Sequence, residues 1–187
     1  MNVVMNSFLI RAQSSTRFFY LYAVLAGLIV VADLIGWRIA AARGVWAATG
    51  FVFLALISWV DWRQRVIPGR LLLTGAVLIL ALRLILEPET VPGTVMGGAA
   101  GLAIFAILAR LADGQLGGGD VWLAGFIGLV TGVVWVAPAL LLGMLLGGLI
   151  AFVLTISGRA QMDDGFPYGP ALSLGTFVIM FWELCNC

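Results

Sequence analysis

The sequence has 187 residues, 63% hydrophobic and only 10% charged, which excludes a soluble domain with an ordinary polar surface and places most of the chain in lipid. The net charge of +1 gives no electrostatic basis for binding nucleic acid. All ten basic residues are Arg, and the absence of His and Lys excludes His-based triads, His-ligated metal sites and Lys Schiff-base chemistry.

The chain begins with a polar stretch that leads into its first apolar run. Residues 1–17 lack the short apolar core and small-residue cleavage site of a removable signal peptide. We interpret them as a cytoplasmic lead-in, and the first apolar run as an uncleaved insertion signal. Residues 1–187 are expected to form a single membrane-embedded domain.

Seven apolar runs are long enough to cross a bilayer, which takes about 17–25 residues. They predict an all-α, polytopic transmembrane helical bundle with spans near 18–37, 44–60, 70–86, 94–111, 121–137, 139–157 and 168–184. The fifth and sixth runs are separated only by Ala137-Pro138, which predicts a tight hairpin there. We expect the clustered glycines to let helices approach closely in lipid: Gly97, Gly98, Gly101, Gly143, Gly147 and Gly148.

The chain ends in its two cysteines, Cys185 and Cys187. Two thiols are too few for a four-ligand zinc site. A C-x-C pair could bind a soft metal or oxidise, but the simpler interpretation is a pair of terminal thiols without a role.

The distribution of Arg predicts the orientation, because cytoplasmic loops carry an excess of positive charge. The loop after the second span holds Arg63, Arg65 and Arg70, and placing it in the cytoplasm puts the acidic loop 87–93 outside. Seven of the ten Arg residues agree with this orientation. Three do not: Arg38, Arg43 and Arg83.

Most of the nine acidic residues have a simple interpretation. Five are expected to be solvated acids in loops or at a helix end: Glu87, Glu89, Asp163, Asp164 and Glu183. Asp113 is expected to be another solvated loop acid. Asp33 lies in or near the first span, where an ionisable group is either functional or neutralised, here by Arg38 or by a position at the interface.

Two acids remain, Asp61 at the end of the second span and Asp120 after a glycine run. Two intervening spans bring the chain back to the same membrane face, so the two carboxyl groups can meet. Such a pair can hydrolyse a peptide without metal or nucleophile: one carboxylate takes a proton from water while the protonated partner donates to the scissile carbonyl. The preceding loop, Gly117, Gly118 and Gly119, would let an extended substrate backbone approach Asp120.

Other interpretations fit the same residues. Asp120 could cap a helix N-terminus, and Asp61 could pair with Arg63 or Arg65 at the interface. A small proton-coupled transporter could use Asp33, Asp61 and Asp120 as a relay. A catalytically inactive scaffold of a pilus or secretion assembly is a third possibility.

Three segments resemble the motifs of the type IV prepilin peptidases, the G-x-G-D intramembrane aspartic peptidases. Asp61 with its downstream Arg63, Arg65, Ile67 and Pro68 resembles the first catalytic-aspartate motif. The segment 117–121, ending in Asp120-Val121, is similar to the G-x-G-D motif, and Pro167-Tyr168-Gly169-Pro170 is similar to the family's Pro-Phe-Gly-Pro stretch.

This resemblance implies an aspartic endopeptidase of the bacterial inner membrane with Asp61 and Asp120 as its catalytic pair. It implies a site without metal or cofactor that faces the cytoplasm. The substrates would be prepilins or pseudopilins of type IV pilus or type II secretion systems, cleaved after a short basic leader that commonly ends in Gly. Arg63 and Arg65 would contact membrane lipid or orient the loop beside Asp61, and Tyr168 with its flanking prolines would pack a helix start near the site.

The chain departs from the family pattern in three places. It shows no match to the N-terminal, often tetra-Cys region associated with N-methylation, so we expect either that the protein lacks methyltransferase activity or that this region is missing from this sequence. Trp122 stands where the family often has Lys, and Gly69 where it usually has Asn or Asp. The last two differences bear on substrate affinity.

Overall fold

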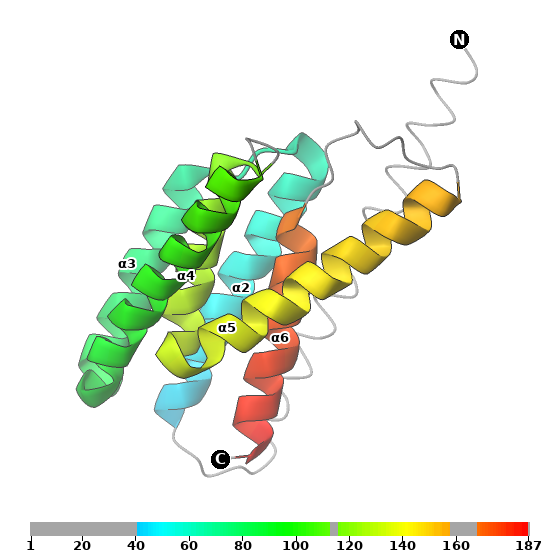
Figure 1. The fold of residues 1–187 in the computed structure, drawn as a ribbon. Helices are drawn as coiled ribbons and strands as arrows, with labels where there is room; N and C mark the ends of the chain where they lie inside the picture. Colours follow the sequence, from blue (N-terminus) through cyan, green and yellow to red (C-terminus); the bar gives the residue numbers. More distant parts are fainter. Residues whose placement is uncertain (1–40, 113–115, 158–167, 187) are drawn as a thin grey trace.

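The computed structural model describes residues 41–112, 116–157 and 168–186, and all elements in these ranges are helical. They are α2 (Ala41–Gln64), α3 (Gly69–Leu86), the 3-10 helix η1 (Pro88–Thr90), α4 (Val91–Leu111), α5 (Gly118–Ile156) and α6 (Tyr168–Asn186). The predicted all-α class is therefore confirmed. Figure 1 shows α2, α3, α4 and α6 as a bundle, with part of α5 crossing it obliquely.

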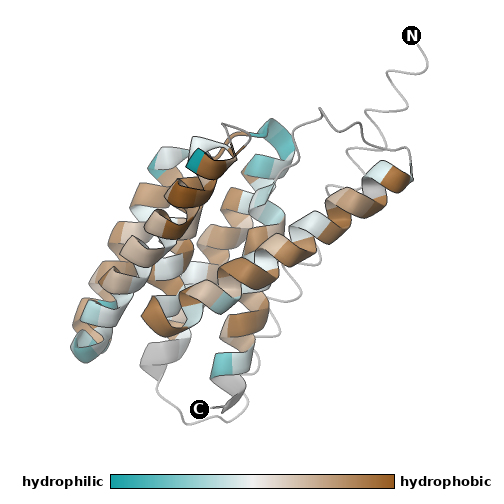
Figure 2. Cartoon of the chain, viewed as in Figure 1, coloured by the Kyte–Doolittle hydropathy of each residue, from teal (hydrophilic) through white to brown (hydrophobic). Residues whose placement is uncertain are grey.

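Four of the described helical segments are long and apolar enough to cross a membrane: Gly44–Gln64, Gly69–Leu86, Pro88–Leu111 and Gly118–Val153. They agree with the predicted second to sixth spans, the fifth and sixth being joined in α5. The predicted first span lies outside the described residues, and the seventh corresponds to α6, which is not among the four. The predicted number of seven spans is thus not confirmed. Figure 2 shows apolar residues along the middle of the helices and polar ones mainly near their ends.

Helix ends follow local sequence signals on both sides of the α2–α3 loop. α2 stops where Arg65 adopts a left-handed backbone conformation, with φ of 53°, and donates its N–H to the carbonyl of Asp61 at 2.8 Å. α3 starts immediately after Pro68, whose carbonyl accepts the N–H groups of Leu71 and Leu72. Proline cannot continue a preceding helix, so this loop turns the chain back into the bundle.

The chain reverses direction at Gly132, not at the predicted Ala137-Pro138 corner. Gly132 has φ of 75° and ψ of 175°, and it divides α5 into a part that packs on α4 and a part that packs on α6, while Pro138 lies within the second part. The physical reason is that a reversal here needs a positive φ, which Gly adopts without strain and which the ring of Pro forbids. Figure 1 shows the second part of α5 leaving this turn and crossing the bundle obliquely.

Glycines bring α4 and the first part of α5 into backbone contact. A Cβ added at Gly97 would collide with the backbone of Gly128, and one at Gly101 with the carbonyl of Ala124. Such contacts bring van der Waals packing and replace the hydrophobic driving force, which is weak between helices in lipid. The packing prediction thus holds for Gly97 and Gly101, and also for Gly98, Gly143 and Gly147, whereas Gly148 has nothing within 4 Å of an added Cβ and is the exception.

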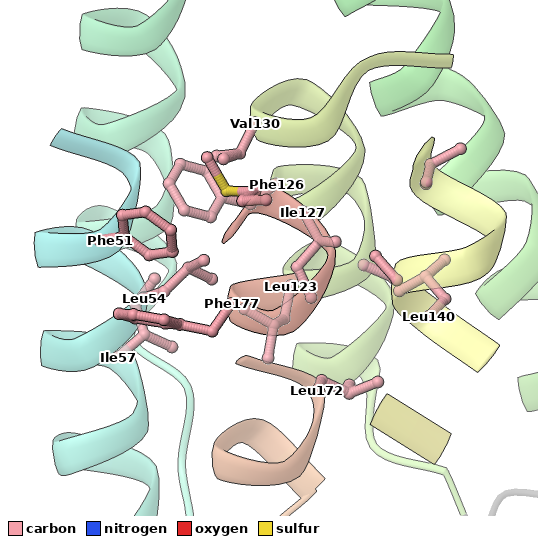
Figure 3. Close-up of a cluster of buried hydrophobic side chains, with 14 of the residues drawn as sticks. Phe51, Leu54, Ile57, Leu123, Phe126, Ile127, Val130, Leu140, Leu172 and Phe177 are labelled. Atoms are coloured by element: carbon pink, nitrogen blue, oxygen red, sulfur yellow. The ribbon is translucent and has the colours of Figure 1, made fainter. Parts of the chain in front are cut away.

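The core lies between α2, the first part of α5, and α6. Figure 3 shows Phe51, Leu54 and Ile57 of α2 beside side chains of the other two helices. The rings of Phe51 and Phe177 have centroids 3.9 Å apart. The remaining labelled members are Leu123, Phe126, Ile127, Val130, Leu140 and Leu172. This packing fixes the ends of the three helices relative to one another, and the ends carry the polar residues discussed next.

Candidate functional site

Asp61 lies in the last turn of α2 and is buried, with 5% of its surface exposed. Its Oδ2 accepts the backbone N–H of Gly169 at 3.0 Å, and Gly169 belongs to the first turn of α6. A carboxylate out of water needs such donors, because burial without a hydrogen bond costs several kcal/mol. Two helices that are far apart in sequence therefore meet at this one side chain.

Asp120 is the third residue of α5 and is half-buried. Its backbone N–H donates to the carbonyl of Gly117 at 3.0 Å, and its carboxylate interacts in return with the backbone N–H of Gly117. An acid in the first turn of a helix that reaches back to the residue before the helix is a known capping arrangement. The helix start thus fixes the direction of this carboxyl group.

Asp61 near the end of α2 and Asp120 at the start of α5 lie at the same end of the bundle, and their carboxyl groups interact electrostatically. Ile67, six residues after Asp61, packs against Gly119, one residue before Asp120, where an added Cβ would come within 3.0 Å of the Ile67 Cβ. In general, two carboxylates held close together repel each other, and such a pair is stabilised when it holds one proton between its members. Paired carboxyls of this kind can carry out general acid–base chemistry on one water.

The glycine run before Asp120 is open on one side. Gly117 and Gly118 are exposed, and a Cβ added at Gly118 would meet no atom within 4 Å. A Cβ added at Gly119 would lie 3.0 Å from Ile67, and one at Gly117 would lie 3.3 Å from Oδ2 of Asp120. The backbone beside Asp120 is therefore accessible to another chain.

The start of α6 is a part of the site that the sequence indicated only through its Pro-Tyr-Gly-Pro motif. Tyr168 begins the helix and packs its ring against Gly147 of α5, where an added Cβ would lie 3.3 Å from the ring. Sequence patterns alone gave no sign that the neighbouring Gly169 contacts Asp61. That contact depends on how α6 docks, which no local pattern encodes.

Several predicted residues cannot be placed, and one was wrongly interpreted. Asp33 and Asp113 lie outside the described residues, as do Asp163, Asp164 and Cys187, and the side chain of Cys185 is not described. Glu87, predicted to be solvated, is buried with 7% exposure and accepts a hydrogen bond from Trp46 Nε1 at 3.2 Å. The prediction failed because loop position was taken to mean exposure, whereas the end of α3 packs on the start of α2.

Glu87 belongs to a buried polar cluster at the other end of the bundle from Asp61. Arg83 is also buried, its guanidinium lies 3.8 Å from the Trp46 ring centroid, and it interacts electrostatically with Glu87 and Glu183. Its Nη2 donates to the carbonyl of Val130 at 2.8 Å, just before the break at Gly132. The sequence had marked Arg83 only as an exception to the orientation rule.

The described residues contain no group of three or more His, Cys, Asp or Glu side chains that could hold a metal ion. Arg63 stacks on its own helix, with its guanidinium 4.3 Å from the Trp59 ring centroid, and the side chain of Arg65 is exposed.

Comparisons with known proteins agree with the motifs. A model described as the type IV leader peptidase family matches residues 48–152, a range that includes Asp61 and Asp120. The chain is similar to a "Prepilin leader peptidase/N-methyltransferase" of Bacillus subtilis (strain 168), with 31% identity over 144 residues, 76% of this chain and 58% of that protein. It therefore spans less than two thirds of that relative's length. No solved structure matches. On the extent of the family match, this multi-pass chain belongs to the type IV leader peptidase family.

Proposed function

We propose that this protein is an intramembrane aspartic endopeptidase that removes the leader peptide from prepilin-like precursors, with Asp61 and Asp120 as its catalytic pair. The observation that carries the proposal is that the carboxyl groups of Asp61, in the last turn of α2, and Asp120, in the first turn of α5, lie close enough to interact electrostatically. The family supplies the reaction class, and the similar Bacillus subtilis protein is named for prepilin leader cleavage.

The proposed reaction uses one water and one shared proton. The ionised member of the pair takes a proton from the water, and the oxygen attacks the carbonyl carbon of the scissile bond. The protonated member donates its proton to the carbonyl oxygen, which gives a tetrahedral diol. Collapse of the diol breaks the C–N bond, with proton transfer to the leaving amine, and returns the pair to its starting state.

The exposed backbone of Gly117 and Gly118 supports a role in substrate binding. A substrate in extended form has unpaired N–H and C=O groups along both edges. A side chain at Gly118 would stand between these groups and the Asp120 loop. The glycine run would therefore admit the scissile segment and align it beside the carboxyl pair.

The charges at this end of the bundle support a cytoplasmic site. Arg63, Arg65 and Arg70 are exposed here, while the opposite end carries the exposed Glu89. Cytoplasmic ends of membrane helices are rich in Arg and Lys, which also meet anionic lipid headgroups. The substrate would be a precursor with a short basic leader in the cytoplasm, followed by a hydrophobic helix in the membrane.

The test is a cleavage assay with purified protein in detergent, using a synthetic prepilin N-terminus that has a basic leader ending in Gly before its apolar segment. Asp61→Asn and Asp120→Asn should each reduce the rate by roughly 10²–10⁴-fold, because each removes one proton-transfer partner. Glu89→Gln, an exposed acid at the opposite end, is the matched control and should cleave normally.

Product mass locates the cut bond. Activity retained in either Asn variant would refute the pair. Proton-coupled uptake by proteoliposomes without any cleavage would instead support the transporter alternative.

A further inference from the structure

The first turn of α6 lies directly on the Asp61 carboxyl group. Gly169 and Asp61 are both buried, and the Gly169 N–H donates to Oδ2 at 3.0 Å. A Cβ added at Gly169 would lie 2.6 Å from that same oxygen. A side chain at position 169 therefore cannot be accommodated unless Asp61 or α6 moves.

The hydrogen bond restricts where a proton can reside on Asp61. An oxygen that accepts an N–H bond is the charged or carbonyl oxygen of the carboxyl group, not the one that carries a proton. With Oδ2 used by Gly169, Oδ1 remains for water or for a proton shared with Asp120. The backbone N–H groups in the first turn of a helix have no acceptor within that helix. When they donate hydrogen bonds to a carboxyl group, they favour its ionised form.

Two further contacts hold α6 in this position. Ser58 Oγ donates to Ser173 Oγ at 2.7 Å, one turn away from Asp61 on α2 and from Gly169 on α6. On its other side, α6 packs on the second part of α5, where a Cβ added at Gly143 would lie 2.7 Å from the Cα of Leu172. The register of α6, and so the place of the Gly169 N–H, is fixed from both sides.

We propose that Gly169 is the positioning residue of the active site: its backbone N–H orients Asp61, reserves Oδ2, and presents Oδ1 to Asp120 and the attacking water. This inference rests on the proposed peptidase function. It gives the start of α6 a role in catalysis through Asp61, with no contact to substrate required.

The test compares pH–rate profiles of cleavage by the full chain. Replacing the Gly169 amide with an ester, through glycolic acid at this position, removes the N–H and adds no atom. A hydrogen bond to a charged group contributes about 1.5–3 kcal/mol, and 1.36 kcal/mol corresponds to one pH unit. Because loss of the donor disfavours ionised Asp61, the acidic limb of kcat against pH should move up by about one to two units, with KM little changed.

Gly169→Ala is the second variant, and Gly148→Ala is its matched control. Gly169→Ala keeps the N–H but displaces Asp61, so it should lower kcat by tenfold or more, whereas an added Cβ at Gly148 meets no atom within 4 Å and should leave cleavage unchanged. An ester variant with an unmoved acidic limb, beside normal wild-type cleavage, overturns this inference alone. A wild-type protein that does not cleave, or an active Asp61→Asn variant, overturns the proposed function and this inference with it.

Discussion

Ser58 and Ser173 are polar residues in the interface between α2 and α6, one turn from the contact of Asp61 with Gly169. Their exposed fractions are 3% and 0%, and their hydroxyls are 2.7 Å apart. In lipid, a buried hydroxyl without a partner is disfavoured, and an interhelical hydrogen bond typically contributes about 0.6–2 kcal/mol. The pair therefore stabilises the docking of α6 next to Asp61.

Single replacement of either serine should destabilise the fold, and double replacement should cost less than the sum. Ser58→Ala or Ser173→Ala leaves the other hydroxyl buried and unpaired, with an expected loss of about 0.5–2 kcal/mol in the free energy of unfolding. The double variant removes both hydroxyls, so the two effects should not add. The free energies of unfolding of the wild type, the two single variants and the double variant can be measured by titration with SDS in mixed micelles and compared.

Thr74→Ala is the control for the Ser58 and Ser173 variants, because the Thr74 hydroxyl is exposed and donates a hydrogen bond within its own helix to the carbonyl of Arg70. It should change the unfolding free energy little. Strictly additive losses for Ser58 and Ser173 would contradict an energetic link between the two helices.

The sequence pointed to those residues of the proposed site that are unusual in their local sequence context. Asp61 and Asp120 differ from the other acids because each follows or precedes a long apolar run. Gly169 acts through its backbone, and Ser58 is one small polar residue among many, so neither carries a signal of its own. Their partners lie 108 and 115 residues away, which only the folded chain reveals.

At the scale of the helices, α5 is the element that organises the bundle. Its break at Gly132 leaves carbonyl groups at the end of its first part without helical partners. Arg83 of α3 binds one of them, that of Val130, and lies on the Trp46 ring of α2. One buried cation thereby connects three helices at the point where α5 reverses.

Arg83→Met should destabilise the protein strongly without altering its proposed chemistry. The variant removes the buried cation that interacts electrostatically with Glu87 and leaves the Val130 carbonyl without its donor, and losing a hydrogen bond from a charged group costs about 1.5–3 kcal/mol. The Arg83→Met/Glu87→Gln double variant should recover part of this loss. Thermal unfolding in detergent measures stability, and cleavage per folded molecule should stay normal because the cluster lies at the other end of the bundle from Asp61.

Arg70→Met is the matched control for Arg83, since Arg70 is an exposed cation on the same helix. Its midpoint of unfolding should remain close to that of the wild type. If Arg83→Met were equally stable, the guanidinium would not support the break in α5.

The sequence predicted which helices exist more accurately than it predicted the residues at which they end. Runs of apolar residues predicted α2, α3 and α4 to within a few residues, because a helix that crosses lipid must satisfy its own backbone and have a fixed minimum length. The corner of α5 was placed at Pro138, six residues beyond Gly132. Gly and Pro both commonly interrupt helices, and only tertiary packing decides that Gly132 turns the chain while Pro138 lies within a helix.

At the scale of the whole molecule, polar residues separate to the two ends of the bundle. One end carries Asp61, Asp120 and exposed arginines, and the other carries the buried Arg83 cluster and the exposed Glu89. This asymmetry is the basis for placing the proposed active site at the cytoplasmic face.

Cysteine labelling in cells tests this orientation. In a chain with Cys185→Ser and Cys187→Ser, single cysteines are introduced by Gln64→Cys or Glu89→Cys, both exposed positions at opposite ends. A membrane-impermeant maleimide added to spheroplasts should label the position 89 variant directly and the position 64 variant only after detergent is added. The reverse pattern would place Asp61 and Asp120 at the outer face.

The sequence by itself determined that this chain lies in lipid and that it is helical. Composition and the length of apolar runs decide these properties, because the bilayer leaves few alternatives. Tertiary structure alone decided that α6 supplies a backbone donor to Asp61, that α5 turns at Gly132, and that Arg83 and Glu87 are buried. Those features depend on contacts between segments far apart in the chain, and such contacts leave no periodic or compositional pattern.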